Sequence, residues 1–368
     1  MTKVLYALIA AVVACVLSGE AAAKSCEGSW QGPERISFDL SEPTSGEALT
    51  LDTAALQDRF TELTNKAGAE AGTLALIAPD GGVETAAVGV EPSDAFWWAS
   101  ATKLVTAALI HQLTEEGVLS LDDTLARWGI DVPGASDITV DQLLRHTSGL
   151  FSFNADKKVR EKPRYRSPDQ LLEIASKHGP DFCPGTNFAY SNTGYLVLGL
   201  IAEQATGLRF ADLVRLRISE PHGLASLAVV TRKDAPAYVQ SPVAGFMTPE
   251  ALSSIGGAGA MVATASDMAL FLRKLLGGEI VSQPTLSNLL QDASPMAGTP
   301  MFFGAGMMAI TVDDPERPSV WIGHSGGAPR GKGLVVLDTR SGAIIAMAFD
   351  RQAPAEAAAN TLLKGFGL

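Results

Sequence analysis

The apolar positions predict strands near both ends of the chain. Two runs, Thr73–Pro79 and Val83–Val90, flank the sequence Asp80-Gly81-Gly82, which is typical of a tight hairpin turn. Four more runs of β-forming residues follow, separated by turn residues: Met307–Val312, Val320–Gly323, Gly333–Leu337 and Ala343–Phe349. Strands from both chain ends predict one antiparallel sheet, with the helices inserted between its two halves.

Helical patterns fill the middle of the chain. Thr139–Gln142 and Ser167–Gln170 are capping boxes, and the second has a proline at its first helical position. Apolar stretches with turn residues at their ends predict further helices at Ser100–Glu116, Asn192–Thr206, Ser266–Leu276 and Pro354–Phe366. The pattern therefore predicts a mixed α/β (α+β) fold.

The first 23 residues have the pattern of a secretory signal peptide. Lys3 precedes an apolar run, Val4–Leu17, that is short for a transmembrane helix, and Ala21–Ala23 offers small residues for cleavage. An uncleaved anchor and lipoprotein processing at Cys15 stay open as alternatives. Since no later stretch is long and apolar enough to span a membrane, we expect a secreted or periplasmic protein without a stable membrane span after cleavage.

Export changes the meaning of the three cysteines. Cleavage removes Cys15 and leaves Cys26 and Cys183, which an oxidising compartment favours as a disulfide; two separate thiols are the alternative. Three cysteines among 368 residues exclude a disulfide scaffold. The net charge of −12 argues against a nucleic-acid partner, because binding phosphates requires a basic face.

The first candidate motif is Ser100-Ala-Thr-Lys103. Residues three apart on a helix share a face, so the hydroxyl and the amine can meet. A serine needs a neighbouring base to become a nucleophile near neutral pH, and a partly desolvated lysine is such a base. Roughly one such spacing is expected by chance in a chain of this composition, so the motif alone also fits a helix cap beside an exposed lysine.

Two further motifs point to the same chemistry. Tyr190-Ser191-Asn192 begins a predicted helix; a tyrosine can relay a proton and an asparagine amide can hold a carbonyl or an amine. His324-Ser325-Gly326-Gly327 lies on a predicted strand, where glycines let a substrate backbone approach and N–H groups can face an oxyanion. The alternatives are a buried tyrosine beside a helix cap and a surface turn.

In this order, the three motifs resemble the serine β-lactamase and penicillin-binding-protein superfamily. The resemblance is to its class C β-lactamase-like branch, which includes D-alanyl-D-alanine carboxypeptidase-like and esterase-like proteins. Connecting segments match as well: Leu143–Leu150, Tyr190–Tyr195, Gly257–Met261 and Thr264–Asp267. The likeness covers roughly residues 52 to 366.

The resemblance implies a division of the chain. After an N-terminal extension at 24–51, an α/β lobe with an antiparallel sheet flanked by helices would comprise about 52–130 and 255–366. An inserted all-helical lobe would comprise about 131–254. The active site is expected between the two lobes, and no metal or organic cofactor is expected.

The resemblance also implies a mechanism. Ser100 would form an acyl-enzyme, while Lys103 and Tyr190 would share the proton transfers. Asn192 would position the substrate, and the backbone N–H groups of Ser100 and Gly327 would form the oxyanion hole. Expected substrates are small molecules or peptides: D-alanyl peptides, β-lactams or esters.

His324 is the main departure, because typical class C β-lactamases have a lysine there. A neutral histidine is a weaker partner for a substrate carboxylate, which favours a peptidase or esterase over a β-lactamase. Ser325, Gly326 and Gly327 would still bind the substrate backbone. Arg330, or Lys332, would supply the missing positive charge, and activity on anionic substrates is expected to depend on the charge of His324 between about pH 5 and 8.

The leading prediction is an exported serine hydrolase similar to D-alanyl-D-alanine carboxypeptidases, acting as a peptidase or esterase. A class C-like β-lactamase and a non-catalytic binding protein on the same scaffold are the alternatives. Two further histidines, His111 and His146, are expected to have structural roles, and Trp97-Trp98 is expected to pack in the core.

Overall fold

The computed structural model describes residues 26, 28–40, 52–233, 249–328 and 331–368. The predicted signal peptide, Cys15 and Arg330 lie outside the described residues. Among the residues described, no helix is long and apolar enough to cross a membrane.

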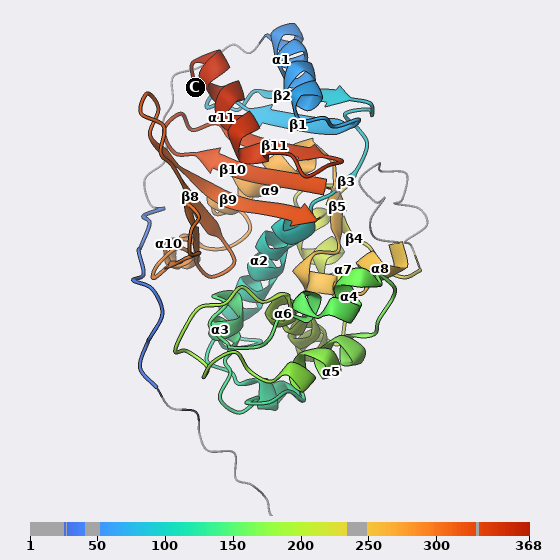
Figure 1. Cartoon of the computed structure of the whole chain (residues 1–368), viewed down its shortest axis with the longest axis vertical. Coiled ribbons are helices and arrows are strands. Elements are labelled where there is room, and N and C mark those ends of the chain that lie inside the picture. The colour runs from blue at the N-terminus through green and yellow to red at the C-terminus, as the bar shows by residue number, and fades with distance from the viewer. Residues whose placement is uncertain (1–25, 27, 41–51, 234–248, 329–330) are drawn as a thin grey trace, which may run out of the picture.

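The main sheet has eight antiparallel strands in the order β2-β1-β11-β10-β9-β8-β7-β6 (Figure 1). The strands are β1 (Gly72–Ile77), β2 (Val83–Val88), β6 (Ser294–Pro295), β7 (Met301–Phe303), β8 (Met308–Val312), β9 (Ser319–Ala328), β10 (Gly331–Asp338) and β11 (Ile344–Phe349). β1 pairs with β11 along its whole length, with Leu74 opposite Met347. The expectation of one antiparallel sheet built from both chain ends is confirmed.

Helices cover both faces of this sheet. α1 (Thr53–Lys66) and α11 (Ala355–Phe366) lie on one face, and α9 (Ala265–Leu276) lies on the other (Figure 1). Alternate residues of a strand point to opposite faces, so Leu74 packs in the cluster that contains Phe60 of α1, and Ala75 packs in the cluster of α9. Every residue of β1 is therefore buried.

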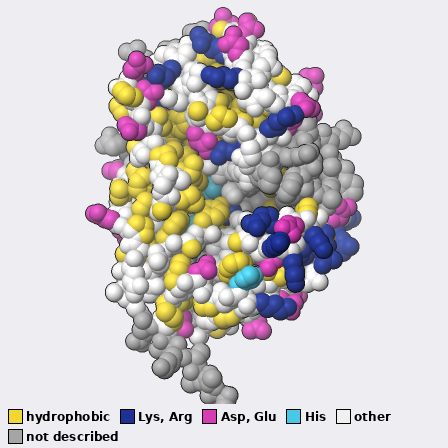
Figure 2. All heavy atoms as spheres, viewed as in Figure 1, with side chains coloured by type: hydrophobic (Ala, Val, Ile, Leu, Met, Phe, Trp, Pro, Cys, Tyr) yellow, Lys and Arg dark blue, Asp and Glu magenta, His cyan; other side chains and the backbone are white. Residues whose placement is uncertain are grey.

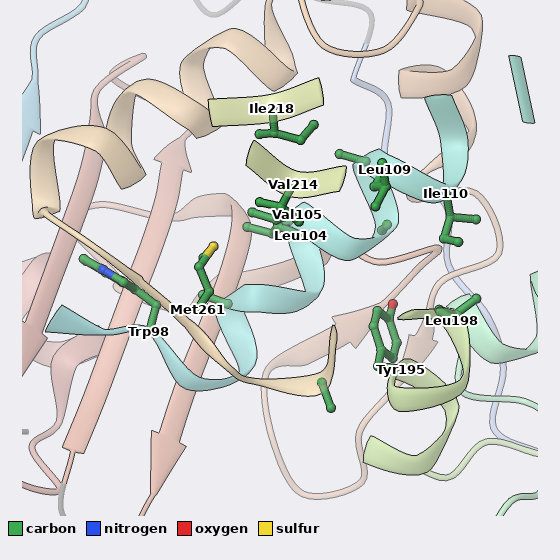
Figure 3. Packing of buried hydrophobic residues seen from close by; sticks show 14 of the residues in the cluster. Trp98, Leu104, Val105, Leu109, Ile110, Tyr195, Leu198, Val214, Ile218 and Met261 are labelled. Carbon is green, nitrogen blue, oxygen red and sulfur yellow. The ribbon is translucent and has the colours of Figure 1, made fainter. Parts of the chain in front are cut away.

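Below the sheet lies a mainly helical region around α2 (Thr102–Glu115), of which eleven of fourteen residues are buried. Figure 3 shows α2 side chains such as Val105 and Leu109 packed near Val214 and Met261. The other helices are α3 (Val140–Leu144), α4 (Lys157–Glu161), α5 (Pro168–His178), α6 (Asn192–Thr206), α7 (Phe210–Val214), α8 (Pro249–Ser253) and α10 (Gln283–Asn288). A small sheet, β3 (Phe96–Trp97), β5 (Met261–Ala263) and β4 (Ala228–Val229), lies beside α2.

Local signals predicted most element positions. α6 has the expected limits, and both capping boxes form, with Thr139 and Ser167 accepting from the N–H of the residue three positions on. The prediction for the Ser100 helix was wrong at its start. Ser100 lies in a 3₁₀ turn, Ala99–Ala101, and the α-helix begins at Thr102.

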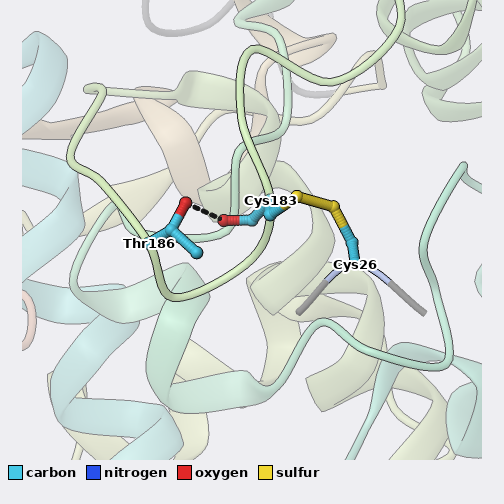
Figure 4. Close-up of a disulfide and its surroundings, with 3 residues drawn as sticks. All are labelled: Cys26, Cys183 and Thr186. Carbon is cyan, nitrogen blue, oxygen red and sulfur yellow. Dashed lines mark hydrogen bonds between the residues drawn. A yellow bond between two sulfur atoms is a disulfide. The ribbon is translucent and has the colours of Figure 1, made fainter. Parts of the chain in front are cut away.

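A disulfide joins Cys26 to Cys183, the pairing that the sequence left open (Figure 4). The Cα atoms are 5.3 Å apart. Farther along, the Gln31 N–H donates to the Thr186 carbonyl, and Ile36 forms a β-bridge with Ala293 next to β6. The segment after Cys26 is thus attached both to the loop before α6 and to the edge of the main sheet.

Candidate active site

Ser100 and Lys103 are brought together at the start of α2. Ala99 has a φ of 46°, in the left-handed region, so the chain turns sharply from β3 into the 3₁₀ turn that holds Ser100. One turn later, Lys103 Nζ lies 3.3 Å from Ser100 Oγ. The three-residue spacing therefore places the amine beside the hydroxyl.

Lys103 is fully buried, although lysine is normally exposed. Its Nζ donates to Asn192 Oδ1 at 2.7 Å and to the Ala258 carbonyl at 2.6 Å. Among the described residues no carboxylate pairs with it, and burial lowers its pKa well below the usual 10.5. Because burial disfavours the charged form, the amine 3.3 Å from Ser100 Oγ is placed to exchange a proton with the serine hydroxyl.

Tyr190 completes the group around Lys103. Lys103 Nζ lies 5.0 Å from the centre of the Tyr190 ring. Burial raises the pKa of Tyr190 well above its usual value, and the neighbouring Ser100 hydroxyl lowers it by a smaller amount. The phenol oxygen is buried and makes no well-formed hydrogen bond within the described structure, so a protonated hydroxyl is held near Ser100 with its proton uncommitted.

His146 holds the Tyr190 segment in place. Its Nδ1 accepts the Ser191 N–H at 3.1 Å, its carbonyl accepts the Ala189 N–H at 3.0 Å, and its ring centre lies 4.2 Å from that of Tyr190. Burial, and then the nearby Lys103, lower the pKa of His146 well below its usual value. The neutral ring can therefore accept at Nδ1, which agrees with the structural role expected for it.

β9 passes directly beside the serine. A Cβ on Gly326 would lie 2.8 Å from the Ser100 nitrogen and 2.4 Å from the Trp98 carbonyl oxygen, so a side chain there would collide with backbone. Gly327, the next residue, borders the same cleft as Ser100. This close approach puts the glycine pair where the oxyanion hole is expected.

His324 lies on β9 with a buried side chain, and its ring centre is 6.3 Å from that of Phe303. Burial, and then the nearby Lys103, lower the pKa of His324 to about 3. The expected pH dependence through His324 between pH 5 and 8 was wrong, because the ring stays neutral throughout that range. The physical reason is that burial removes water from the charged form of the ring. The spacing of residues in the sequence does not show how deeply this side chain is buried.

Of the two cations expected to supply positive charge near the serine, the one that is described is already paired with a carboxylate. Lys332 forms an ion pair with Glu356 at 2.6 Å, and Arg330 lies outside the described residues. Ser325 is buried on β9 opposite Leu334. In the part of the chain that is described, no group of three or more His, Cys, Asp or Glu residues is placed to hold a metal ion.

A cleft of about 240 Å³ opens in front of Ser100. Trp97 lines it, whereas Trp98 is fully buried, so the expectation of core packing holds for Trp98 and only in part for Trp97. The lining also includes three arginines that the motifs did not indicate: Arg160, Arg164 and Arg166. Their signal in the sequence is the run of Lys and Arg after Asp156.

The sequence of the chain matches a family model described as Beta-lactamase over residues 56–365. It is 27% identical over 262 residues to Penicillin-binding protein 4* of Bacillus subtilis. The aligned region covers 64% of this chain and 56% of that protein. It is 25% identical over 207 residues to Teichoic acid D-alanine hydrolase of Staphylococcus aureus. That alignment covers 55% of this chain and 51% of the hydrolase. The chain therefore spans about half the length of the curated relatives it matches.

Solved structures extend the likeness to the whole fold. The D-amino acid amidase from Ochrobactrum anthropi SV3 superposes with a TM-score of 0.74 at 25% identity, covering 84% of this chain and 99% of the amidase. A penicillin binding protein from Bacillus halodurans has the same fold, with a TM-score of 0.70. With the family match over most of its length, the chain belongs to the beta-lactamase family of serine hydrolases.

Proposed function

We propose that this protein hydrolyses D-alanyl amide or ester bonds through an acyl-enzyme on Ser100. The observation that carries the proposal is the fully buried Lys103, whose Nζ lies 3.3 Å from Ser100 Oγ and whose pKa burial lowers well below its usual value. The acyl group is suggested by two relatives, whose names specify a D-amino acid amidase and a D-alanine hydrolase.

In the proposed reaction, Ser100 Oγ attacks the substrate carbonyl carbon while its proton moves to the Lys103 lone pair. The N–H groups of Ser100 and Gly327 stabilise the oxyanion, and each such donor contributes about 3 kcal/mol in comparable hydrolases. The proton then passes through the Tyr190 hydroxyl to the leaving amine or alcohol, and the acyl group stays on Ser100. A water molecule repeats these steps to release the acid and restore Ser100.

The neutral histidine on β9 bears on the substrate class. A D-alanyl-D-alanine carboxypeptidase must hold a terminal carboxylate next to the scissile bond, and His324 offers no positive charge there above about pH 3. An amide or ester without a carboxylate at that position is therefore favoured over the carboxypeptidase reaction.

We also propose that the protein is exported. The Cys26–Cys183 disulfide supports this, because such bonds persist in oxidising compartments. The apolar leader pattern at the N-terminus points in the same direction.

The test is hydrolysis of D-alanine p-nitroanilide by the mature protein, with the L-enantiomer and Ser100→Ala as controls. We expect Ser100-dependent hydrolysis with a preference for the D form, and a mass increase on Ser100 with a slowly hydrolysed ester. Full activity of Ser100→Ala would overturn the mechanism, and a preference for the L form would overturn the proposed substrate.

Penicillin is the second candidate substrate, because one relative is named as a penicillin-binding protein. Intact-mass measurement after mixing with penicillin separates the possibilities. A lasting adduct on Ser100 indicates a penicillin-binding type, and rapid release of penicilloate indicates a β-lactamase.

A further inference from the structure

The segment 157–166 reverses the charge balance of the chain. It contains six of the 28 Lys and Arg residues but only one of the 40 Asp and Glu residues, Glu161. It comprises α4 and the loop that leads to α5. Figure 2 shows Lys and Arg side chains gathered on this face of the molecule, where Figure 1 places α4.

This basic segment forms one wall of the cleft in front of the serine. Arg160 and Arg164 border the same cavity as Ser100, Asn192 and Gly327. Among the described residues that line this cavity there is no Asp or Glu, and the only charged ones are the three arginines. No described carboxylate within the cleft therefore neutralises this positive charge.

The arginines of this segment differ in whether their guanidinium groups already have partners within the protein. Arg166 is buried and donates to the Lys158 and Lys162 carbonyls at 2.9 and 3.2 Å, so it holds the loop together. Arg160 and Arg164 are exposed, and neither has an ion pair within the described structure. These two guanidinium groups are thus available to a ligand.

On the catalytic side of the cleft, the described basic groups are buried or already paired. Burial lowers the pKa of Lys103 well below its usual value and that of His324 to about 3, and Lys332 is paired with Glu356. Among the described residues that line the cleft, an anion would therefore meet exposed positive charge at Arg160 and Arg164. Apolar side chains line the space between the two sides: Trp97, Phe153, Leu171 and Ile255.

We propose that Arg160 and Arg164 bind an anionic group, a carboxylate or a phosphate, of the acyl substrate whose carbonyl lies at Ser100. A guanidinium group presents parallel N–H donors that match either anion in a bidentate geometry. The substrate class is then a D-alanyl amide or ester that carries a negative charge at a distance from the scissile bond. This inference rests on the proposed serine hydrolase activity.

The test uses two series of D-alanine anilides, one with the variable group on the leaving aniline and one with it on an N-acyl cap. Each series has a neutral carboxamide, a carboxylate and a phosphonate member. In Arg160→Gln/Arg164→Gln, we expect kcat/KM for an anionic member of at least one series to fall about tenfold relative to its neutral partner, mainly through KM. The ratio of kcat/KM for the anionic member to kcat/KM for the neutral member is compared between the wild-type protein and the variant. Because both proteins act on the same two anilides, differences in the intrinsic reactivity of the anilides cancel.

The matched control is Lys66→Gln/Arg340→Gln, which removes two exposed cations that do not line the cleft. This control is expected to keep the ratio of the wild-type protein. A fall for carboxylates alone or for phosphonates alone identifies the anion. An unchanged ratio in both series overturns the inference while neutral anilides are still cleaved, whereas Ser100-independent cleavage of the neutral anilides overturns the proposed function itself.

Discussion

The two sides of the cleft treat charge in opposite ways. On one side, burial disfavours the charged forms of Lys103, Tyr190 and His324. On the other side, Arg160 and Arg164 are exposed and keep their charge. The comparison shows that the surroundings of a basic residue decide its role. Burial makes Lys103 suited to accept a proton, whereas exposure makes Arg160 and Arg164 suited to bind an anion.

For Lys103 and the two arginines, the structural origin of this difference is the segment of chain that carries each group. α2 lies in the core, so Lys103 is surrounded by protein on all sides and loses its hydration. α4 is a short surface helix with no buried residue. The guanidinium groups of Arg160 and Arg164, on α4 and on the loop after it, therefore stay in contact with water.

The largest effect is expected from Lys103→Arg. Arginine stays charged at any pH at which the protein is folded, so it cannot accept the Ser100 proton. Because a general base contributes about 10²–10⁴-fold, kcat/KM for a neutral anilide should fall at least about 10³-fold. Steady-state kinetics check this, with circular dichroism to establish that the variant is folded.

A matched control is Lys177→Arg, an exposed lysine paired with Glu173 at the end of α5, which should keep wild-type activity. If Lys103→Arg were folded and retained more than a tenth of the activity, an uncharged base would not be needed.

The next largest effect concerns His111, a second basic group that α2 buries, away from the cleft. Burial lowers its pKa to about 4, so the native state binds fewer protons than the unfolded state between pH 6.5 and 4. Stability is then lost as the pH falls through this window, by about 3 kcal/mol at pH 4 from this group. Urea unfolding at pH 7 and pH 4 measures the loss, which should be smaller in His111→Gln. An equal loss in both proteins would show that the histidine is not held neutral.

A third prediction concerns a substitution that should favour the charged form of Lys103 on the catalytic side of the cleft. Asn192→Asp places a carboxylate at the position of the amide oxygen that lies 2.7 Å from Lys103 Nζ, which should raise the pKa of the lysine. We expect kcat/KM to fall about 10²-fold at pH 7 and to recover as the pH rises. The readout is the full pH profile. A loss that does not change with pH would indicate a structural defect and not a charged lysine.

The smallest expected effect is the salt dependence of anion binding at Arg160 and Arg164. Raising the salt concentration from about 0.05 to 0.5 M should lower kcat/KM about threefold for an anionic anilide, because screening weakens charges on an exposed rim. The neutral anilide should show no such change, since its reaction uses the buried, uncharged groups. Equal salt dependence of the two substrates would contradict a charged rim.

Local patterns predicted much of the fold but not its buried environments. The capping boxes, the Asp80–Gly82 turn and the limits of α6 follow from a few neighbouring residues, and all three were predicted. α1 was not predicted, although Leu56 and Phe60 are spaced as on one helix face. Strands of two or three residues, such as β3, carry too few positions for a pattern.

The site shows the same division. The spacing of Ser100 and Lys103 predicted that they meet, and they do although Ser100 lies in the 3₁₀ turn before α2, because residues three apart share a face in either kind of helix. The neutrality of His324 depends on residues distant in the chain, such as Lys103 and Phe303, that pack around it. The basic run was visible in the sequence, but its position on the wall of the cleft comes from tertiary packing.

The most direct test of the account is the pH dependence of Ser100 modification by an uncharged fluorophosphonate, followed by mass spectrometry. If Lys103 is already neutral at physiological pH, the rate should reach its plateau near pH 7 and stay constant to pH 10. A rate that keeps rising with an inflection near 10.5, the usual pKa of lysine, would show that Lys103 is charged in the folded protein and would contradict the account.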